Sequence, residues 1–375
     1  MSEAERELSW RHERGSTRLL LGSGAFERLL AERSRHLDRA PLLLVDESVL
    51  EGHRERIDSI AGTWSGAAVV AVPGGERAKC FAELERVLEA CAERKLPRDG
   101  VLIAIGGGAC TDLAGLAAAL WMRGVAWLAV PTTLLALVDA SVGGKTAINL
   151  GAAKNLVGTF HAPQQVALDP SFLVTLPRAE LRSGLAEVVK AALLSADDSF
   201  AELERFDPET ELRSSRWLEV IERAVRLKIA VVESDERESG PRRALNLGHT
   251  LAHGLEQERG FGALRHGDAV AIGLVAACDF AVARGLFTPA QRARVVALLA
   301  RFGLPLSPPR DLDVSAVLRA LLLDKKIEGG RLRYVLPRGL PAAAPGAVAF
   351  VEDVSAAEVE RWLYSSIESS SSVSQ

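Results

Sequence analysis

The sequence predicts an α/β amino-terminal domain with a Rossmann-like parallel sheet, followed by a mainly α-helical carboxy-terminal domain. Strand-length apolar runs alternate with helical stretches in the first half, and a triple-glycine turn follows the third run. After about residue 169, long stretches with an apolar period of 3.6 residues take over. We therefore expect domains at residues 1–169 and 170–364, and a disordered, serine-rich tail at 365–375.

Length and composition agree with two globular domains. A chain of 375 residues is too long for one ordinary core, and 48% hydrophobic with 25% charged residues is typical of a globular protein. The formal net charge of -4 gives no overall attraction for nucleic acid. Any anion that this protein binds must be held by a local cluster of lysine and arginine.

The sequence also indicates where the protein works. The first 15 residues are rich in charge and do not resemble a secretory signal, and the apolar runs at 128–138 and 269–277 are too short or interrupted to span a bilayer. The four cysteines, Cys80, Cys91, Cys110 and Cys278, are far apart without a CxxC pair. We expect reduced core cysteines in a cytoplasmic protein that contacts neither membrane nor nucleic acid.

The predicted sheet begins with three short apolar runs. Residues 42–46, 67–72 and 101–105 are strand-length and bordered by turn residues, with a helical stretch at 80–95 between the last two. This alternation is typical of a parallel sheet covered by helices. The second half contains six helical stretches, at 178–195, 215–232, 245–258, 266–284, 289–302 and 314–323.

Glycines 106–108 follow the third strand and precede a helical stretch at 112–122. A glycine turn at a helix start exposes backbone N–H groups at the positive end of the helix dipole, which suits a pyrophosphate. A plain tight turn explains the same pattern equally well. Asp112 either caps the helix or approaches the cofactor, and the loop of residues 73–76 before Lys79 carries little information alone.

Residues 130–159 carry polar groups in an otherwise small and apolar segment. Asp139, Lys145, Lys154 and Asn155 lie within it, beside a glycine pair at 143–144 that permits close approach of a ligand. An ammonium group is a compact partner for phosphate or carboxylate. The alternative is a loop with two surface lysines.

A third group of residues indicates a metal. Glu187 and Lys190 share one helical face in an apolar stretch, although a surface salt bridge has the same spacing. His249 and His253 are four residues apart and can meet one object, and His266 follows within eighteen residues. No glutamate follows His249, which excludes the HExxH arrangement. Together with the carboxylate at 187, the cluster predicts a divalent metal site.

These residues belong to motifs that run from about residue 42 to 336, and the chain resembles the 3-dehydroquinate synthase family there. The motifs, in order, are GGGACTDLAG, MRGV, VPTTLLALVDASVGGKTAIN, KNLVGTF, LRSGLAEVVK, ALNLGHTLAHGLE, HGDAVAIGL and DKK. The resemblance implies NAD and zinc as cofactors, with cobalt as an alternative metal, and a homodimer.

The resemblance also implies a reaction. The substrate would be 3-deoxy-D-arabino-heptulosonate 7-phosphate, a small sugar phosphate with a carboxylate, converted to 3-dehydroquinate and phosphate in the shikimate pathway. A ring hydroxyl is oxidised with NAD, phosphate is eliminated, the hydride is returned, and an intramolecular aldol step closes the carbocycle. Two anionic ends on one substrate explain a concentrated set of lysines and arginines in an acidic chain.

The resemblance further assigns roles to individual positions. Glu187, His249 and His266 match metal ligands, whereas His253 matches a residue that moves substrate protons, which corrects the spacing argument. Other matches to catalytic positions are Glu238, Lys190, Lys145 and Asn155. Matches to cofactor-binding positions are Asp46, Glu76, Lys79, Gly107, Gly108, Asp112, Thr132, Thr133, Asp139, Lys145, Lys154 and Thr175. Matches to substrate-binding positions are Arg123, Asp139, Lys145, Asn155, Lys190, Lys228, Arg242, Asn246, Lys325 and Lys326.

Two of these matches carry a further expectation. Arg123 corresponds to an arginine that the family lends across the dimer interface, and either Lys325 or Lys326 completes the grip on phosphate. The chain departs from the family pattern in AALLSADDSF after Lys190 and in Leu251-Ala252, which bears on fine specificity.

Three other functions remain to be weighed. A sister cyclase for a sedoheptulose or hexose phosphate would not need the carboxylate grip of Lys145, Lys154, Asn155 and Arg242. An iron- or zinc-dependent alcohol dehydrogenase would use an aspartate and three histidines, without several lysines for an anion. A catalytically silent binding protein would have lost some of the metal-binding residues, and all of them are present.

Overall fold

The computed structural model describes residues 6–34, 40–151, 153–208, 215–238, 240–260, 263–323, 327–328, 331–340 and 348–372. The chain divides into two compact units, the first formed by Met1–Leu181 with Glu211–Glu236, and the second by Arg182–Thr210 with Arg237–Gln375. The predicted boundary after residue 169 differs from this division. Helix α7 (Arg216–Ser234) is grouped with the first unit, because it packs against β1 and the short helix η3.

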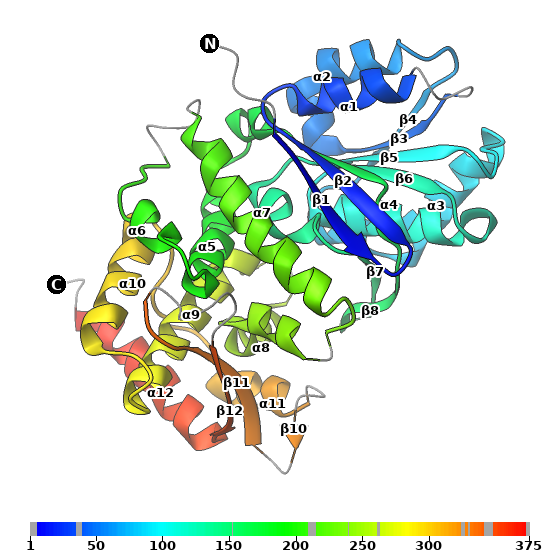
Figure 1. The fold of residues 1–375 in the computed structure, drawn as a ribbon. Helices are drawn as coiled ribbons and strands as arrows, with labels where there is room; N and C mark the ends of the chain where they lie inside the picture. The colour runs from blue at the N-terminus through cyan, green and yellow to red at the C-terminus, as the bar shows by residue number, and fades with distance from the viewer. Residues whose placement is uncertain are drawn as a thin grey trace. The chain divides into compact units, whose positions relative to one another are not determined.

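The first unit is built on a seven-stranded sheet. All neighbouring strands are parallel except the edge strand β1, which pairs antiparallel with β2. Figure 1 shows this sheet in blue to cyan and green. In spatial order its strands are β1 (Arg6–His12), β2 (Gly15–Leu21), β9 (Gln165–Leu168), β6 (Ala126–Pro131), β5 (Val101–Gly106), β3 (Leu42–Asp46) and β4 (Ala68–Val72).

Helices cover both faces of this sheet. Helices α1 (Ala25–Ser34) and α2 (Glu47–Ala61) pack on one face, and α3 (Phe81–Glu93) and α4 (Gly108–Leu120) on the other (Figure 1). Every residue of β3 and β5 is therefore buried. This explains their continuous apolar sequences, since a parallel sheet with two covered faces has no solvent side.

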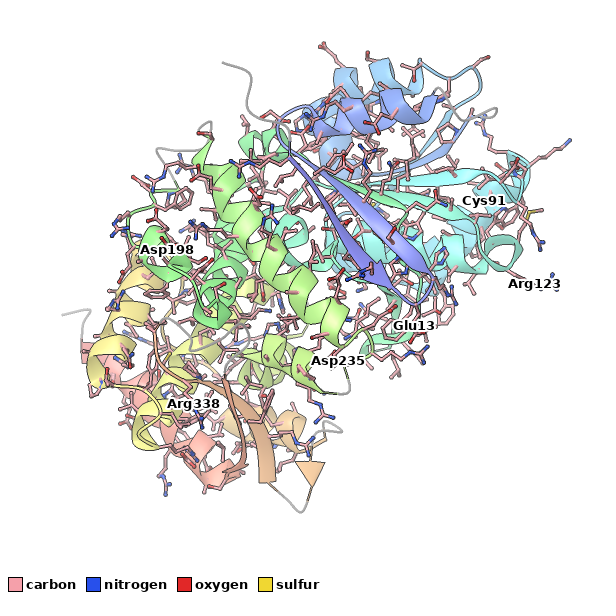
Figure 2. The ribbon with its side chains drawn as sticks, in the orientation of Figure 1. Glu13, Cys91, Arg123, Asp198, Asp235 and Arg338 are labelled. Atoms are coloured by element: carbon pink, nitrogen blue, oxygen red, sulfur yellow. The ribbon has the colours of Figure 1, made fainter. Side chains whose placement is uncertain are left out.

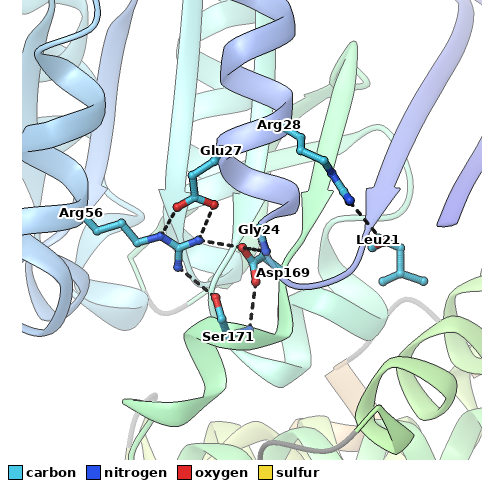
Figure 3. A network of polar contacts seen from close by, with 7 residues as sticks. All are labelled: Leu21, Gly24, Glu27, Arg28, Arg56, Asp169 and Ser171. Carbon is cyan, nitrogen blue, oxygen red and sulfur yellow. Dashed lines mark hydrogen bonds and ion pairs between the residues drawn. The ribbon is translucent and has the colours of Figure 1, made fainter. Parts of the chain in front are cut away.

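A polar network joins three parts of the first unit (Figure 3). Arg56 of α2 donates to Glu27 of α1 and, at 2.7 Å, to the fully buried carboxylate of Asp169. Its guanidinium also lies 4.3 Å from the ring centroid of Phe172. Asp169 in turn accepts the backbone N–H groups of Gly24 and Ser171. The buried carboxylate is thus paired and hydrogen-bonded, as burial of a charge requires.

Shorter elements complete the first unit. A two-stranded ribbon of β7 (Lys145–Leu150) and β8 (Ala153–Phe160) packs against α4. Helix α7 is tied to β1 by an ion pair between Glu222 and Arg6. The short helices are η1 (Gly75–Ala78), η2 (Trp121–Arg123), η3 (Ala136–Ala140) and η4 (Pro170–Val174).

The second unit is mainly helical. A three-stranded antiparallel sheet of β10 (Ile327–Glu328), β11 (Arg331–Pro337) and β12 (Val348–Val354) accompanies the helices. The helices are α5 (Arg178–Leu194), α6 (Ser199–Leu203), η5 (Pro241–Asn246), α8 (His249–Arg259), α9 (His266–Ala283), α10 (Pro289–Arg301), α11 (Val314–Leu323) and α12 (Ala356–Ser372). Among the described helices, α9 alone is long and apolar enough to cross a membrane, and it is mostly buried as a core helix.

Three expectations differ from the structure. The tail predicted as disordered from residue 365 continues α12 to Ser372, where the Ser369 hydroxyl donates to the Ser365 carbonyl and Ile367 is half-buried. The helix predicted to start at residue 245 starts at His249, after a left-handed glycine at 248. The helix expected at 112–122 begins already at Gly108, since glycine at its first turn does not prevent helix formation there.

Candidate active site

Three helices of the second unit each contribute one donor to a compact cluster. Glu187 comes from the middle of α5, while His249 and His266 are the first residues of α8 and α9. One ligand atom from each lies within 4.8 Å of the other two. Residues separated by almost eighty positions in the sequence therefore meet at one point.

Two glycines let these helices approach closely enough. A Cβ atom on Gly267 would lie 1.8 Å from the carbonyl oxygen of Ser183, and the N–H of Gly267 donates to the Ser183 hydroxyl at 3.0 Å. A Cβ atom on Gly273 would lie 1.9 Å from the carbonyl oxygen of Gly248. Because Gly267 and Gly273 have no side chains, α9 can pack directly against α5 and α8. This close packing sets the positions of the two histidines.

The carboxylate of Glu187 is buried in this cluster with a lysine beside it. Both of its oxygens are inaccessible, and neither accepts a hydrogen bond of good geometry from the described residues. Lys190 Nζ lies 2.5 Å from Oε2, one helical turn along α5. Burial alone would raise the pKa of Glu187, but Lys190 and the two histidines hold it well below the usual range. Glu187 is therefore ionised, as a metal ligand must be.

The surroundings shift the pKa values of the two histidines in opposite directions. Burial and the Lys190 ammonium lower the pKa of His249 to about 3, so its ring is neutral and offers a lone pair. Burial alone would also lower the pKa of His266, but contacts with the carboxylates of Glu187 and Glu256 raise it to about 9. A position that stabilises a positively charged imidazole between two carboxylates has a potential that also favours a cation.

The donor set fits a divalent metal such as zinc. Two imidazoles and one carboxylate are among the three-ligand sets of catalytic zinc sites, which keep a fourth position open for water or substrate. The poorly satisfied, buried oxygens of Glu187 also fit, since such groups carry a desolvation cost that a bound cation removes.

His253 lies next to this cluster without contributing a donor to it. Its ring centroid is 5.7 Å from that of His249, and its side chain is exposed. Sequence spacing pairs these two histidines, whereas the donor group found among the described residues pairs His249 with His266. Four-residue spacing places two side chains on one face, but only a neighbouring helix determines which of them meets a third ligand.

In the first unit, several residues predicted to bind the cofactor lie at the carboxyl ends of parallel strands. Asp46 ends β3, and Gly106 ends β5 so close to it that a Cβ there would lie 3.0 Å from the Asp46 Cβ. Gly107 precedes α4 and Gly108 begins it. The helix start, free of side chains, leaves backbone N–H groups accessible beside the strand ends, which fits the pyrophosphate of a dinucleotide.

A buried lysine links predicted cofactor and substrate residues in the first unit. Lys79 Nζ donates to Asp112 at 2.5 Å and to the side-chain oxygen of Asn155. Burial raises the pKa of Asp112, which the Lys79 ammonium opposes. Asn149 joins the group, because its amide donates to Glu76 at 2.7 Å and its oxygen accepts the N–H of Asn155. Lys154 Nζ lies 3.9 Å from Glu76.

A second buried lysine is held by the short helix η3. Lys228 of α7 donates to the carboxylate of Asp139 at 2.7 Å and also to its backbone carbonyl. Lys145 is exposed at the start of β7. Thr132 is buried after β6, next to Thr133, whose hydroxyl accepts the N–H of Ala136. Thr175 is exposed, and its hydroxyl lies 2.7 Å from His53 Nε2.

Three residues predicted to bind substrate or to take part in catalysis have a strained backbone. Arg123, Asn155 and Glu238 all have φ between 55° and 67°, in a region that only asparagine among them tolerates well. Such strain persists where surrounding contacts or a function maintain it. The Glu238 carboxylate accepts the amide of Asn246 at 2.7 Å, and Arg242 is buried nearby in sequence on η5.

One predicted substrate residue follows the carboxyl end of α4. Arg123 is exposed at the periphery of the first unit (Figure 2), and it follows the 13 residues of α4, so about 20 Å of helix separates it from the glycine turn. Lys325 and Lys326 lie outside the described residues.

Two residues near these groups escaped the sequence reasoning. Glu256 is buried and contacts His266, and Asn149 connects Glu76 with Asn155. A signal for Glu256 existed, since it lies seven residues after His249 on the same helical face. Asn149 had no comparable signal, because its role depends on how the β7–β8 ribbon folds back.

Residues 69–183 match a family model described as 3-dehydroquinate synthase N-terminal, and residues 184–327 match one described as 3-dehydroquinate synthase C-terminal. A 3-dehydroquinate synthase of Synechococcus sp. strain CC9605 is 39% identical over 354 residues, which cover 92% of this chain and 94% of the relative.

Solved structures share the fold. A 2-epi-5-epi-valiolone synthase from Streptomyces hygroscopicus subsp. jinggangensis 5008, with NAD+ and Zn2+ bound, has a TM-score of 0.80 at 30% identity, covering 91% of this chain and 95% of that one. A 2-deoxy-scyllo-inosose synthase complexed with carbaglucose-6-phosphate, NAD+ and Co2+ has a TM-score of 0.81 at 23% identity, covering 96% and 100%. This second likeness concerns the fold alone.

Proposed function

The chain belongs to the 3-dehydroquinate synthase family, and we propose that Glu187, His249 and His266 hold the divalent metal on which its lyase activity depends. The observation that carries this proposal is the meeting of three donors from three helices around a buried, poorly satisfied carboxylate. Zinc suits the set of two imidazoles and a carboxylate, and cobalt accepts the same ligands.

NAD, the metal and the residues of the chain each contribute a different part of the chemistry. When bound, NAD supplies reversible removal of a hydride from a ring hydroxyl, and the metal supplies polarisation of an alcohol oxygen, which lowers its pKa. Binding of the substrate and transfer of protons are carried out by residues of the chain. We assign NAD to the carboxyl ends of β3, β5 and β6, and its pyrophosphate to the glycine turn before α4.

Proton transfer is assigned to His253, with Glu238 as a second carboxylate at the reacting carbon. His253 is exposed one turn beyond the ligand His249, so it can exchange protons with a bound substrate and with water. Glu238 is fixed by Asn246 at 2.7 Å, which orients its carboxylate. Two differently placed groups can serve the elimination and the aldol step without leaving their positions.

The remaining polar residues bind the two anionic ends of the substrate. Lys228 is buried and already held by Asp139, so little side-chain entropy is lost when an anion arrives. Our assignment for carboxylate, hydroxyl and phosphate groups comprises Lys145, Asn155, Lys190, Lys228, Arg242 and Asn246, with Asp139 and Lys154 serving cofactor or substrate. The same assignment gives the phosphate one of Lys325 and Lys326.

We further propose a cytoplasmic homodimer in which Arg123 serves the phosphate site of the neighbouring subunit. Its exposed, strained position at the far end of α4 supports a role outside its own subunit's glycine turn. Mixing Arg123→Ala and His266→Ala chains tests this, because each heterodimer would contain one complete site. Partial recovery of activity is expected, and absence of recovery in verified heterodimers would contradict the exchange.

The carboxylated substrate is tested against the sister-cyclase alternative with two substrates. We expect phosphate release from 3-deoxy-D-arabino-heptulosonate 7-phosphate and little from sedoheptulose 7-phosphate, which lacks the carboxylate. Lys145→Met should reduce kcat/KM for the first substrate by about 10-fold or more, the scale of one lost charged contact. Preferential turnover of sedoheptulose 7-phosphate would overturn the substrate assignment while leaving the metal site intact.

A further inference from the structure

One face of α8 carries three polar side chains in a helix that is otherwise largely buried. His249, His253 and Glu256 follow each other at spacings of four and three residues, so they line one stripe along the helix. Glu256 is 3% exposed. A carboxylate is rarely buried to this extent unless it has a partner, because burying a charge is costly.

One partner of Glu256 is a proposed metal ligand. Glu256 Oε1 lies 3.5 Å from Nδ1 of His266, and Nε2 of the same ring lies 3.3 Å from Oε1 of Glu187. The imidazole therefore has one carboxylate at each nitrogen, one from α8 and one from α5. Nδ1 faces Glu256 and Nε2 faces Glu187, and these two contacts define the orientation of the ring.

His249 has the same arrangement with a different anchor. Its Nδ1 lies 3.2 Å from the backbone carbonyl oxygen of Leu247, and its Nε2 lies 3.4 Å from Glu187 Oε1. Both histidines thus have an acceptor at Nδ1 and turn Nε2 toward the same carboxylate oxygen. A hydrogen-bond acceptor at one ring nitrogen places the proton there and leaves the lone pair on the other.

We propose that Glu256 is a positioning residue for His266: it accepts the Nδ1 hydrogen and thereby presents Nε2 to the metal held with Glu187 and His249. The proposal rests on the proposed metal site and extends it by one residue outside the ligand set. Glu256 does for His266 what the Leu247 carbonyl does for His249. Such partners of ligating histidines tune metal affinity, and their loss typically weakens it by about 10- to 100-fold.

The experiment compares zinc affinity across matched variants of the full chain. Zinc is titrated in competition with a chromogenic chelator into wild type, Glu256→Ala and Glu256→Gln, and into Glu258→Ala and Glu258→Gln as controls on the same helix. Glu258 accepts the backbone N–H of Asp313 and pairs with Arg259, so it does not serve His266. Thermal unfolding with chelator and with zinc is recorded for each variant.

We expect Glu256→Ala to bind zinc about 10- to 100-fold more weakly than wild type, and Glu256→Gln to lie between them, because its amide oxygen still accepts a hydrogen bond. The rise in melting temperature on adding zinc should shrink in the same order, and both Glu258 variants should behave as wild type. A purely structural Glu256 would lower the melting temperature without changing the zinc-dependent rise.

Zinc affinity of Glu256→Ala or Glu256→Gln within twofold of wild type would overturn the proposal. If the alanine variant fails to fold, the glutamine variant, which matches glutamate in size, decides the question. If Glu256→Gln also unfolds, the negative charge of Glu256 is needed for folding and not for the orientation of His266. That result also overturns the proposal. Retention of zinc by His266→Ala would instead disprove the proposed metal site, so the two failures are distinguishable.

Discussion

Lys190 Nζ lies 2.5 Å from Oε2 of Glu187, and both side chains are almost completely buried on one face of α5. An ammonium beside a carboxylate that we propose as a metal ligand compensates its charge before the cation arrives. Removing one member of a buried pair typically costs about 3–5 kcal/mol, because the other charge is left without a partner.

Lys190→Ala should therefore destabilise the zinc-depleted protein by about 3–5 kcal/mol. Zinc should restore much of this loss, since the bound cation supplies the missing positive charge to Glu187. Urea unfolding with chelator and with zinc measures both values. The pair Arg86–Glu83 has the same three-residue spacing but lies at the surface, with Arg86 exposed and Glu83 half-buried, and Arg86→Ala should cost less than about 1 kcal/mol. Equal destabilisation of Lys190→Ala with and without zinc would contradict this coupling.

His266 and His253 should behave differently in a metal assay. We expect His266→Ala to lose bound metal and turnover, because its Nε2 is one of the three clustered donors. His253→Ala should keep its metal and lose turnover, by about 100-fold or more as for other general acid–base groups. Elemental analysis of the purified variants gives the metal content, and the opposite pattern would exchange the two assignments.

Gly267 should be essential to the position of His266. A methyl group at Gly267 would overlap the Ser183 carbonyl and force α9 away from α5. Gly267→Ala should lower stability by about 1–3 kcal/mol, as overpacking does, and weaken zinc binding at the same time. Gly52→Ala is the control, because its new methyl group would meet Thr175 at 3.6 Å, an ordinary contact. Unchanged zinc affinity in folded Gly267→Ala would show that the close approach does not set the site.

Glu222 should contribute stability that depends on pH. Burial alone would raise its pKa, but hydrogen bonds from Arg6 and Arg226 lower the pKa below the usual value. The folded state therefore holds the proton less tightly than the unfolded state, so the contribution is present above the ordinary glutamate pKa of about 4.3 and is lost as pH falls through the folded value.

Glu222→Gln should accordingly be less stable than wild type at pH 7, and this difference should shrink as pH falls below about 4.3. Unfolding free energies measured across this range for both proteins check the trend, with the exposed Glu85→Gln as control. A stability difference that stays constant with pH would show that the contacts of Glu222 do not depend on its charge.

The sequence predicted the fold well where local patterns decide it. Buried runs such as residues 42–46 and 101–105 are strands within a residue of the expected bounds, and most of the helices in the second half start and end close to their periodic stretches. The sequence analysis missed the strands β1, β2 and β9. Strand β9 pairs with β2 from the opposite end of the first unit, and pairing at such separation leaves no local signal. Strands β1 and β2 form a local hairpin, which was overlooked although its two strands are neighbours in the sequence.

The site was predicted unevenly for a related physical reason. Glycines, lysines and histidines in unusual surroundings identified candidates, and resemblance to a family assigned their roles. Spacing along one helix could not choose between His253 and His266, since that choice depends on the approach of α9 to α5 through Gly267. Glu256 and Asn149 were missed because their roles depend on contacts with His266 and Glu76, which only the folded structure shows.

The most direct test follows phosphate release and nicotinamide absorbance together. The full chain is supplied with 3-deoxy-D-arabino-heptulosonate 7-phosphate, NAD and zinc. A cyclase that returns its hydride should release phosphate continuously without lasting NADH, and Glu187→Gln, which removes the charge of a proposed ligand, should abolish the release. Accumulation of NADH in proportion to substrate would indicate a dehydrogenase, and absence of both signals in the zinc-loaded protein would contradict the assigned reaction.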